Sequence, residues 1–245
     1  MNRAYRSPAG KNDILYGLHT VMAVLSHEPH RCKKLFIARR EGERSLIELA
    51  EKKQLSYELL DREGLNKRFG LGSECQGVAL LCSPYSYCKL EDLLLGDRKR
   101  LLFLDSWQDA ANLGRAARAA LCFGADGLII LKDRSAQITP AAEKSAVGAL
   151  SQIPVARITN MAQGLEKAKD HNFFVYGAFE DGRVSLRQCD FSQKVALVIG
   201  QEGEGIRQLV KKSCDVMVKI PMSSESICLN AADTALIFLY ELSMR

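Results

Sequence analysis

Apolar and polar positions follow two different periodicities along the chain, and the segments that show them alternate. Short continuous apolar runs with β-branched residues are typical of strands buried on both faces of a sheet, whereas apolar residues three and four positions apart are typical of helices. In the second part of the chain we expect strands at 101–105, 127–131, 155–158, 173–178, 195–199 and 216–222, and helices at 116–122, 140–150, 161–170, 206–214 and 229–240. This alternation predicts an α/β fold with a mostly parallel sheet covered on both faces.

The first part of the chain alternates in the same way over a shorter length. Strands are predicted at 34–38, 56–60 and 76–82, and helices at 16–25, 44–53 and 62–69. The composition then shifts to prolines, tyrosines and a charged helical piece, which predicts a linker with a short docking helix. We therefore expect a basic arm at 1–11, a small α/β domain at 12–83, a linker at 84–100 and a larger domain at 101–245.

The overall composition is that of an ordinary globular protein. Of 245 residues, 47% are hydrophobic and 26% are charged, which argues against disordered and fibrous classes. No apolar run approaches the roughly 18 residues of a transmembrane helix, and the first residues are polar and basic without an apolar signal segment. We therefore expect a cytosolic protein without a membrane span.

Net charge adds little, but its local distribution is compatible with a nucleic-acid partner. The formal charge is +5, from 34 basic and 29 acidic residues. Basic clusters that fit either a phosphate backbone or a solvated surface occur at 31–34, 39–40, 67–68, 98–100, 115 with 118, and 211–212. Trp107, Tyr85 and Tyr87 are candidates for stacking on RNA bases, although packing inside the protein is the favoured interpretation.

Nothing in the sequence predicts a metal site. The eight cysteines are scattered, and no two have the C-x-x-C spacing of a zinc or redox site. His27, His30 and Cys32 lie close together in sequence, but no second ligand pair at structural-zinc spacing accompanies them.

A glycine loop follows the apolar run at 195–199 and is the first candidate for a ligand site. Its sequence from Gly200 to Gly205 is Gly-Gln-Glu-Gly-Glu-Gly. Glycines allow positive φ and let a ligand approach main-chain N–H groups without an intervening Cβ. Such a loop by itself is weak evidence for ligand binding. A dinucleotide-dependent oxidoreductase is a poor alternative, because the expected G-x-G-x-x-G spacing is not met.

The order of three motifs is more specific than the loop alone. The segment 109–114 followed by Arg118, the segment 198–205, and the pair 220–222 with 229–230 resemble the motifs of the SpoU-type RNA ribose 2′-O-methyltransferases, in the trefoil-knotted SPOUT superfamily. The segment 132–137 looks like the form found in the bacterial large-subunit rRNA guanosine branch. Tyr16-Gly17-x-His19 and Gln76-Gly77 resemble the ribosomal-protein-like substrate-binding domain of that branch, although Cys75 stands where histidine is common.

This resemblance implies an activity, a substrate class and an assembly. The implied fold is a deep trefoil knot preceded by a small α/β substrate-binding domain. The implied reaction is methyl transfer from S-adenosylmethionine to a ribose 2′-hydroxyl, with a guanosine of 23S rRNA as the expected target and tRNA as the alternative. The resemblance also implies a homodimer built through the knot. Its interface would include part of the last helix, where we expect apolar surface from Leu236, Ile237, Leu239 and Tyr240.

The same resemblance assigns the site residues. Those implied to line the cofactor pocket are Gly200, Gly205, Ile220, Met222 and Leu229; those implied to serve catalysis are Asn112, Arg118, Glu202, Cys228 and Asn230. A guanidinium has a pKa above about 12, so Arg118 suits phosphate clamping and alkoxide stabilisation better than proton removal. We expect Asn112 to bridge Arg118 or the ribose, and Glu202 to orient the arginine.

Four departures from the family pattern leave a second hypothesis open. Ala110 stands where proline is common, Ser224 where glycine is common, Cys228 where serine is common, and Asp233 within a segment that usually reads Val-Ser-Val. A thiol is a weaker hydrogen-bond donor than a hydroxyl, so Cys228 is the most consequential of them. The alternative is a relative that binds RNA with the same fold and transfers methyl groups poorly or not at all. Retention of the two asparagines, the arginine and the glutamate argues against it.

Overall fold

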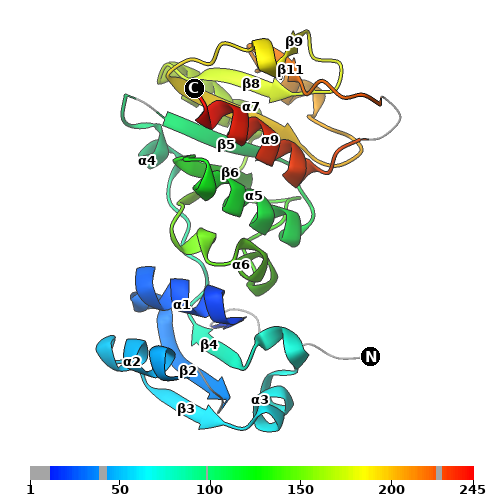
Figure 1. Ribbon diagram of the computed structural model, residues 1–245. Coiled ribbons are helices and arrows are strands. Elements are labelled where there is room, and N and C mark those ends of the chain that lie inside the picture. The colour runs from blue at the N-terminus through cyan, green and yellow to red at the C-terminus, as the bar shows by residue number, and fades with distance from the viewer. Residues whose placement is uncertain (1–11, 39–42, 98, 225–227) are drawn as a thin grey trace. The chain divides into compact units, whose positions relative to one another are not determined.

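The computed structural model describes residues 12–38, 43–97, 99–224 and 228–245 (Figure 1). Internal contacts divide the chain into two compact units. The first comprises Met1–Ser86 with Ile138–Gln152, and the second comprises Tyr87–Gln137 with Ile153–Arg245. The segment Ile138–Gln152, which the strand and helix pattern assigned to the second domain, therefore packs within the first unit.

The first unit is built on a four-stranded sheet in the order β1-β4-β2-β3. Its strands are β1 (Asp13–Tyr16), β2 (Cys32–Ala38), β3 (Tyr57–Leu60) and β4 (Val78–Cys82). Only β2 and β3 are parallel, because β4 runs antiparallel to both β1 and β2. Its helices are α1 (Leu18–His27), α2 (Arg44–Lys52), α3 (Arg62–Phe69) and α6 (Pro140–Ala146). Strand β1 was not among the predicted elements.

A buried ion pair joins α6 to the rest of the first unit. The side chain of Arg31 is 2% exposed and donates to Glu28 Oε2 at 2.5 Å and to Glu143 Oε1 at 2.8 Å. Tyr85 lies beside the same guanidinium, 5.3 Å from its ring centroid, and is buried. Both side chains are buried, so Arg31 belongs neither to a phosphate-binding surface nor to the solvated surface that was favoured for its cluster, and Tyr85 packs internally.

The second unit is built on a seven-stranded sheet in the order β7-β6-β5-β10-β8-β11-β9. Its strands are β5 (Lys99–Asp105), β6 (Gly127–Leu131), β7 (Val155–Ile158), β8 (Phe174–Ala178), β9 (Val184–Ser185), β10 (Lys194–Gly200) and β11 (Val216–Lys219). Every pair of named strands in this sheet is parallel. The predicted α/β fold with a mostly parallel sheet is confirmed.

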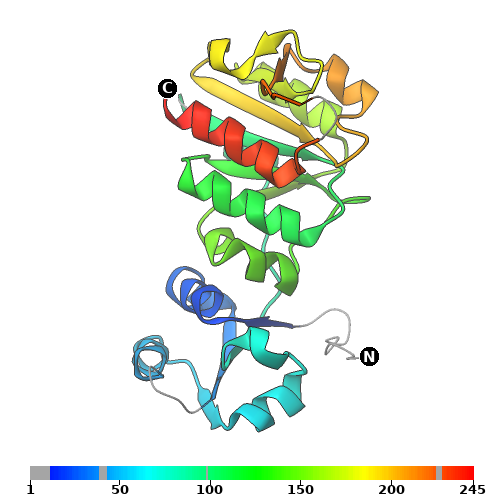
Figure 2. The ribbon, with the colours of Figure 1, turned by 45° about the vertical axis from the view of Figure 1, so that its right-hand side comes forward.

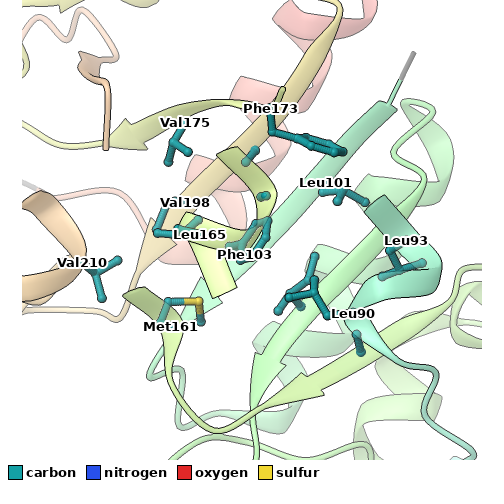
Figure 3. Packing of buried hydrophobic residues seen from close by; sticks show 14 of the residues in the cluster. Leu90, Leu93, Leu101, Phe103, Met161, Leu165, Phe173, Val175, Val198 and Val210 are labelled. Carbon is teal, nitrogen blue, oxygen red and sulfur yellow. The ribbon is translucent and has the colours of Figure 1, made fainter. Parts of the chain in front are cut away.

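Helices cover both faces of the seven-stranded sheet. They are α4 (Leu90–Leu94), α5 (Ala110–Cys122), α7 (Met161–Asp170), α8 (Gln208–Lys212) and α9 (Ala231–Ser243). On one face, Leu90 of α4 and Leu165 of α7 pack on Phe103 and Val198 of the central strands (Figure 3). Helices α5 and α9 lie side by side on the other face (Figures 1 and 2). Among the described residues, no helix has both the length and the apolarity to cross a bilayer.

Three element boundaries differ from the sequence prediction for identifiable reasons. Helix α6 stops at Ala146 because Val147 has a φ of 53°, a left-handed conformation that ends an α-helix. Strand β11 ends at Lys219, two residues before Pro221, which cannot donate to a sheet. Helix α5 starts at Ala110, six residues earlier than predicted, because Asp109 caps it by accepting from the Ala111 N–H at 2.8 Å. Asn112 therefore lies in the first turn of a helix.

Candidate active site

The carboxyl ends of β5 and β10 bring two predicted motifs together. Asp105 and Gly200 are paired in the register of these strands, so the segments that follow them leave the sheet at one edge. Helix α9 begins at the same place, where the side chain of Asn230 caps it by accepting from the Ala232 N–H at 2.8 Å. Parallel α/β sheets bind ligands at this edge.

The glycine loop folds tightly back on β10. The Gly205 N–H donates to the Gln201 carbonyl at 3.0 Å. A Cβ at Gly200 would lie 2.0 Å from the Gly205 carbonyl carbon and 2.2 Å from the Ile206 nitrogen, both of which are backbone atoms. Gly203 differs, because its φ is 81° and an added Cβ would meet nothing within 4 Å. Close packing thus requires the first glycine, and a left-handed turn favours the second.

We expect Gly200→Ala to open the loop and to weaken ligand binding at this edge. The backbone clash should destabilise the protein by about 3 kcal/mol, the upper part of the range for overpacked sites. Gly203→Ala is the matched control and should cost only about 1 kcal/mol, the strain of a left-handed alanine. Urea unfolding measures both. Equal losses for the two variants would contradict the packing role of Gly200.

A buried carboxylate, that of Asp105, binds the segment that follows the glycine loop. Asp105 is fully buried, and it accepts hydrogen bonds from Arg207 N at 3.0 Å, Nε at 2.9 Å and Nη2 at 2.6 Å. Trp107 is also buried, and its Nε1 donates to the Ile199 carbonyl at 3.1 Å. Trp107 therefore packs inside the protein, as the favoured interpretation held, and does not stack on RNA.

Three of the predicted polar residues meet in one cluster. Asn112 Nδ2 donates to Glu202 Oε1 at 2.7 Å, and Asn230 Nδ2 donates to the same oxygen. Arg115, which the motif comparison did not single out, donates through Nη2 to Asn230 Oδ1 at 3.0 Å and to Asn112 Oδ1. The cluster thus joins α5, the glycine loop and the start of α9 through four side chains.

Arg118 lies outside this cluster. It is exposed and forms no hydrogen bond or ion pair with another described residue. An α-helix has about 3.6 residues per turn, so Arg115, three positions after Asn112, shares its face, whereas Arg118, six positions after it, does not. Within this chain, therefore, Asn112 does not bridge Arg118 and Glu202 does not orient it; the alternative that Asn112 holds the ribose stays a prediction. The sequence signal for Arg115 was its three-residue spacing from Asn112.

A cavity of about 180 Å³ lies beside the cluster, and all five residues that were predicted to bind the cofactor line it. The predicted residues in its lining are Gly200, Gly205, Ile220, Met222 and Leu229, together with Cys228. Its walls also include Phe179, Glu180, Thr234 and Phe238, which the sequence motifs did not indicate. The exposed Cys228 thiol lies 3.7 Å from Glu180 Oε2. Ser224 and Asp233 do not line this cavity.

A second cavity of about 120 Å³ adjoins the first. It is lined by Trp107, Gln108, Asp109, Asn112, Gln201, Glu202 and Ala231. Gln201, Glu202 and Ala231 are common to both linings. Glu202 therefore stands between a cavity with apolar walls and one that faces Asn112.

No metal-binding group is found in the part of the chain that the structure describes. Three or more metal-ligating side chains do not converge anywhere in it. Cys32 Sγ instead lies 3.7 Å from the Glu28 carbonyl.

Comparisons with known proteins match nearly the whole chain. The profile of the SpoU rRNA Methylase family matches residues 99–240, and that of RNA 2′-O ribose methyltransferase substrate binding matches residues 14–88. The 23S rRNA (guanosine-2′-O-)-methyltransferase RlmB of Salmonella typhimurium is 35% identical over 94% of this chain and 97% of its own length. The RlmB of Escherichia coli is 34% identical over the same shares.

Solved structures agree on the fold. The SpoU methyltransferase AviRb from Streptomyces viridochromogenes, in complex with the cofactor AdoMet, superposes with a TM-score of 0.82. The alignment covers 96% of this chain and 90% of AviRb at 22% sequence identity.

Proposed function

We propose that this chain, which belongs to the SpoU rRNA Methylase family, transfers a methyl group from S-adenosylmethionine to the 2′-hydroxyl of a guanosine ribose in 23S rRNA. The observation that carries the proposal is the pair of adjoining cavities that share Glu202. The larger one contains the residues implied to bind the cofactor, and the smaller one contains Asn112. Because the proposed substrate is rRNA, we propose that the protein acts in the cytoplasm.

The larger cavity fits S-adenosylmethionine. Ile199, Val218, Leu229 and Phe238 supply apolar walls for an adenine ring. Gly200, Gly203 and Gly205 have no Cβ, so the main chain is open to close approach by a ligand. Glu180 supplies a carboxylate that suits the positive charges of the cofactor's methionine part. The bound cofactor would supply an activated methyl group.

The polar cluster prepares the ribose for transfer. A 2′-hydroxyl is a poor nucleophile, so it must be held in line with the methyl group, and its developing negative charge must be stabilised. Asn112 can hold the ribose with both a donor and an acceptor, and Arg115 orients Asn112 and Asn230. Arg118, which is unpaired among the described residues, is available to the RNA phosphate and the forming alkoxide. We assign the hydroxyl proton to the Glu202 carboxylate, because a guanidinium cannot accept it.

The test is S-adenosylmethionine binding by calorimetry, combined with transfer of labelled methyl to purified 23S rRNA, 16S rRNA and tRNA. We expect cofactor binding and labelling of a guanosine ribose in 23S rRNA alone. Labelling of tRNA alone would replace the substrate assignment with the tRNA alternative. Cofactor-independent RNA binding without any transfer would instead support the RNA-binding relative.

Cys228 provides a chemical readout of cofactor occupancy. At pH 8 we expect iodoacetamide to label the exposed thiols of Cys228 and Cys122 and to spare Cys214, because burial raises the pKa of the Cys214 thiol to about 12. S-adenosylmethionine should protect Cys228, which lines the cavity, and leave Cys122 on α5 unaffected. Mass spectrometry of the labelled peptides measures this. Undiminished labelling of Cys228 at saturating cofactor would place the cofactor elsewhere.

We also propose that the chain forms a homodimer through α9, as the family resemblance implies. Leu236 and Tyr240, one helical turn apart, are 43% and 52% exposed. Leu239 is only 2% exposed and packs in the core, so its expected contribution to an apolar surface is wrong. The exposed ring of Tyr240 packs edge-on against Phe123, the residue that follows α5, with 5.6 Å between the ring centroids, which extends the apolar surface from α9 to the end of α5.

We expect Leu236→Glu to convert the dimer to a monomer, because it places a charge within this apolar surface. Light scattering after size-exclusion chromatography measures the mass of the assembly. Leu209→Glu is the matched control, since Leu209 of α8 is 72% exposed and lies away from α5 and α9. A dimer that survives Leu236→Glu and dissociates with Leu209→Glu would move the interface to α8.

A further inference from the structure

A cavity rich in cationic side chains lies at the same carboxyl edge of the parallel sheet as the cofactor cavity, but beside the strands β6 and β7. Its volume is about 380 Å³, and it is formed where β6 and β7 end and α4 and α7 begin. The charged residues in its lining are Lys89, Glu91, Lys132, Arg157 and Lys167. None of them takes part in the candidate active site.

The cavity keeps a net positive charge after its internal pairing. Lys167 Nζ pairs with Glu91 Oε1 at 2.7 Å, so the one carboxylate in the lining is already neutralised. The ammonium groups of Lys89 and Lys132 form no ion pair with another described residue, and both side chains are exposed. With Arg157, three cations therefore remain to attract an anion.

One of these cations, Arg157, lies over the ring of Tyr87, and the two side chains together form a platform. The guanidinium of Arg157 lies 4.0 Å from the ring centroid of Tyr87, and Arg157 Nη1 donates to Gln137 Oε1 at 3.3 Å. Guanidinium and aromatic planes are surfaces on which unpaired RNA bases stack. An inorganic phosphate would use the cations alone and leave this platform and much of the volume empty.

A short loop connects this cavity to the candidate active site. Lys132 follows β6 and begins the segment 132–137, which ends at Gln137, the partner of Arg157. Within this loop, Ser135 Oγ donates to the Trp107 carbonyl at 3.1 Å, and the Arg134 carbonyl accepts from Gln108 Nε2 at 2.8 Å. Trp107 and Gln108 line the smaller cavity beside Asn112. This loop therefore joins Trp107 and Gln108 of the smaller cavity to Lys132 of the cationic cavity.

From this arrangement we propose that the cavity between α4 and α7 binds a second nucleotide of the same RNA strand as the methylated one. Its phosphate is held by Lys132, Lys89 and Arg157, and its base stacks on the platform of Arg157 and Tyr87. The proposal rests on the proposed function for the identity of the RNA. It assigns to the methyltransferase unit an RNA contact of its own, separate from the substrate-binding unit.

The test compares single variants of equal charge change. Lys132→Ala and Arg157→Ala should each weaken binding of a 23S rRNA transcript about fivefold to tenfold, and each should reduce the slope of log K against log salt by about 0.7, the value for one phosphate contact of a single strand. Arg187→Ala is the matched control. Arg187 is exposed, and its carbonyl accepts from Arg245 at the end of α9 opposite the active site, so its loss should change binding less than twofold.

Separate readouts distinguish the failure of this proposal from that of the proposed function. Cofactor affinity should be the same in all variants, because no residue of this cavity lines the cofactor pocket. If wild-type protein methylates 23S rRNA and all three variants bind it equally well, the second nucleotide site is overturned and the function stands. If wild-type protein methylates no RNA, the function falls, and the binding comparison still decides the site. Micromolar binding of 5′-GMP that is lost in Lys132→Ala would assign the cavity to a free nucleotide and overturn the RNA proposal.

Discussion

Arg118→Ala lowers the rate of methyl transfer to RNA by about 10²–10³-fold, the cost of removing one stabilising group from a developing charge, and leaves S-adenosylmethionine affinity unchanged. The reason is the position of Arg118, which is exposed, unpaired among the described residues and absent from the cofactor lining. Its loss therefore removes no interaction that supports the folded site. Single-turnover transfer of labelled methyl, with calorimetric titration of the cofactor, measures the two effects separately.

Arg115→Ala is the informative comparison, because Arg115 lies one turn earlier on the same helix. Its contacts are to Asn112 and Asn230, so we expect a smaller loss of rate, about tenfold, through disorder of the two amides. Arg118→Lys should retain part of the activity, since the charge is kept, although the planar fork is lost. An inactive Arg115→Ala beside a fully active Arg118→Ala would transfer the electrostatic role from Arg118 to Arg115.

Arg207→Ala destabilises the second unit by about 3–5 kcal/mol, the cost of leaving a buried charge without its partner. The charge is that of Asp105, which is 0% exposed and accepts hydrogen bonds from two side-chain nitrogens of Arg207, Nε and Nη2. Because Arg207 lies two residues after the end of the glycine loop and Asp105 ends β5, their separation should also loosen the cavity that the loop lines. Urea unfolding and cofactor calorimetry report the two consequences.

Two further variants test whether the buried charge is the cause. Replacing Asp105 by Asn in the Arg207→Ala background removes the uncompensated charge, so we expect it to restore part of the lost stability. Lys167→Ala breaks another ion pair of the same unit, in which both side chains are 57% exposed, and should change stability by less than about 0.5 kcal/mol. Equal losses for Arg207→Ala and Lys167→Ala would mean that burial of Asp105 contributes nothing.

The sequence alone determined the fold class and most of the elements. The predicted segments 127–131, 155–158 and 161–170 coincide with β6, β7 and α7. A strand buried on both faces requires a continuous apolar run, and an amphipathic helix requires apolar residues three and four positions apart, so both patterns are visible in the sequence. The resemblance to the SpoU-type enzymes, and not the periodicity, indicated five residues that line one cavity, Gly200, Gly205, Ile220, Met222 and Leu229. The strand pattern indicated only their place, because the carboxyl ends of parallel strands lie at one edge of the sheet. Their contact with the cofactor stays a prediction.

Only the tertiary structure decided which side chains meet. Arg115 and not Arg118 joins the amide cluster, because the early start of α5 under the Asp109 cap places Asn112 on a helix and selects the residue three positions on. Trp107 and Arg31 are buried and form hydrogen bonds with residues 92 and 112 positions away in the sequence. The local sequence pattern carries no information about such distant partners. The same holds for the cationic cavity. Its lysines look like solvated surface in the sequence, and only the packing of α4 and α7 against β6 and β7 gathers them around one space.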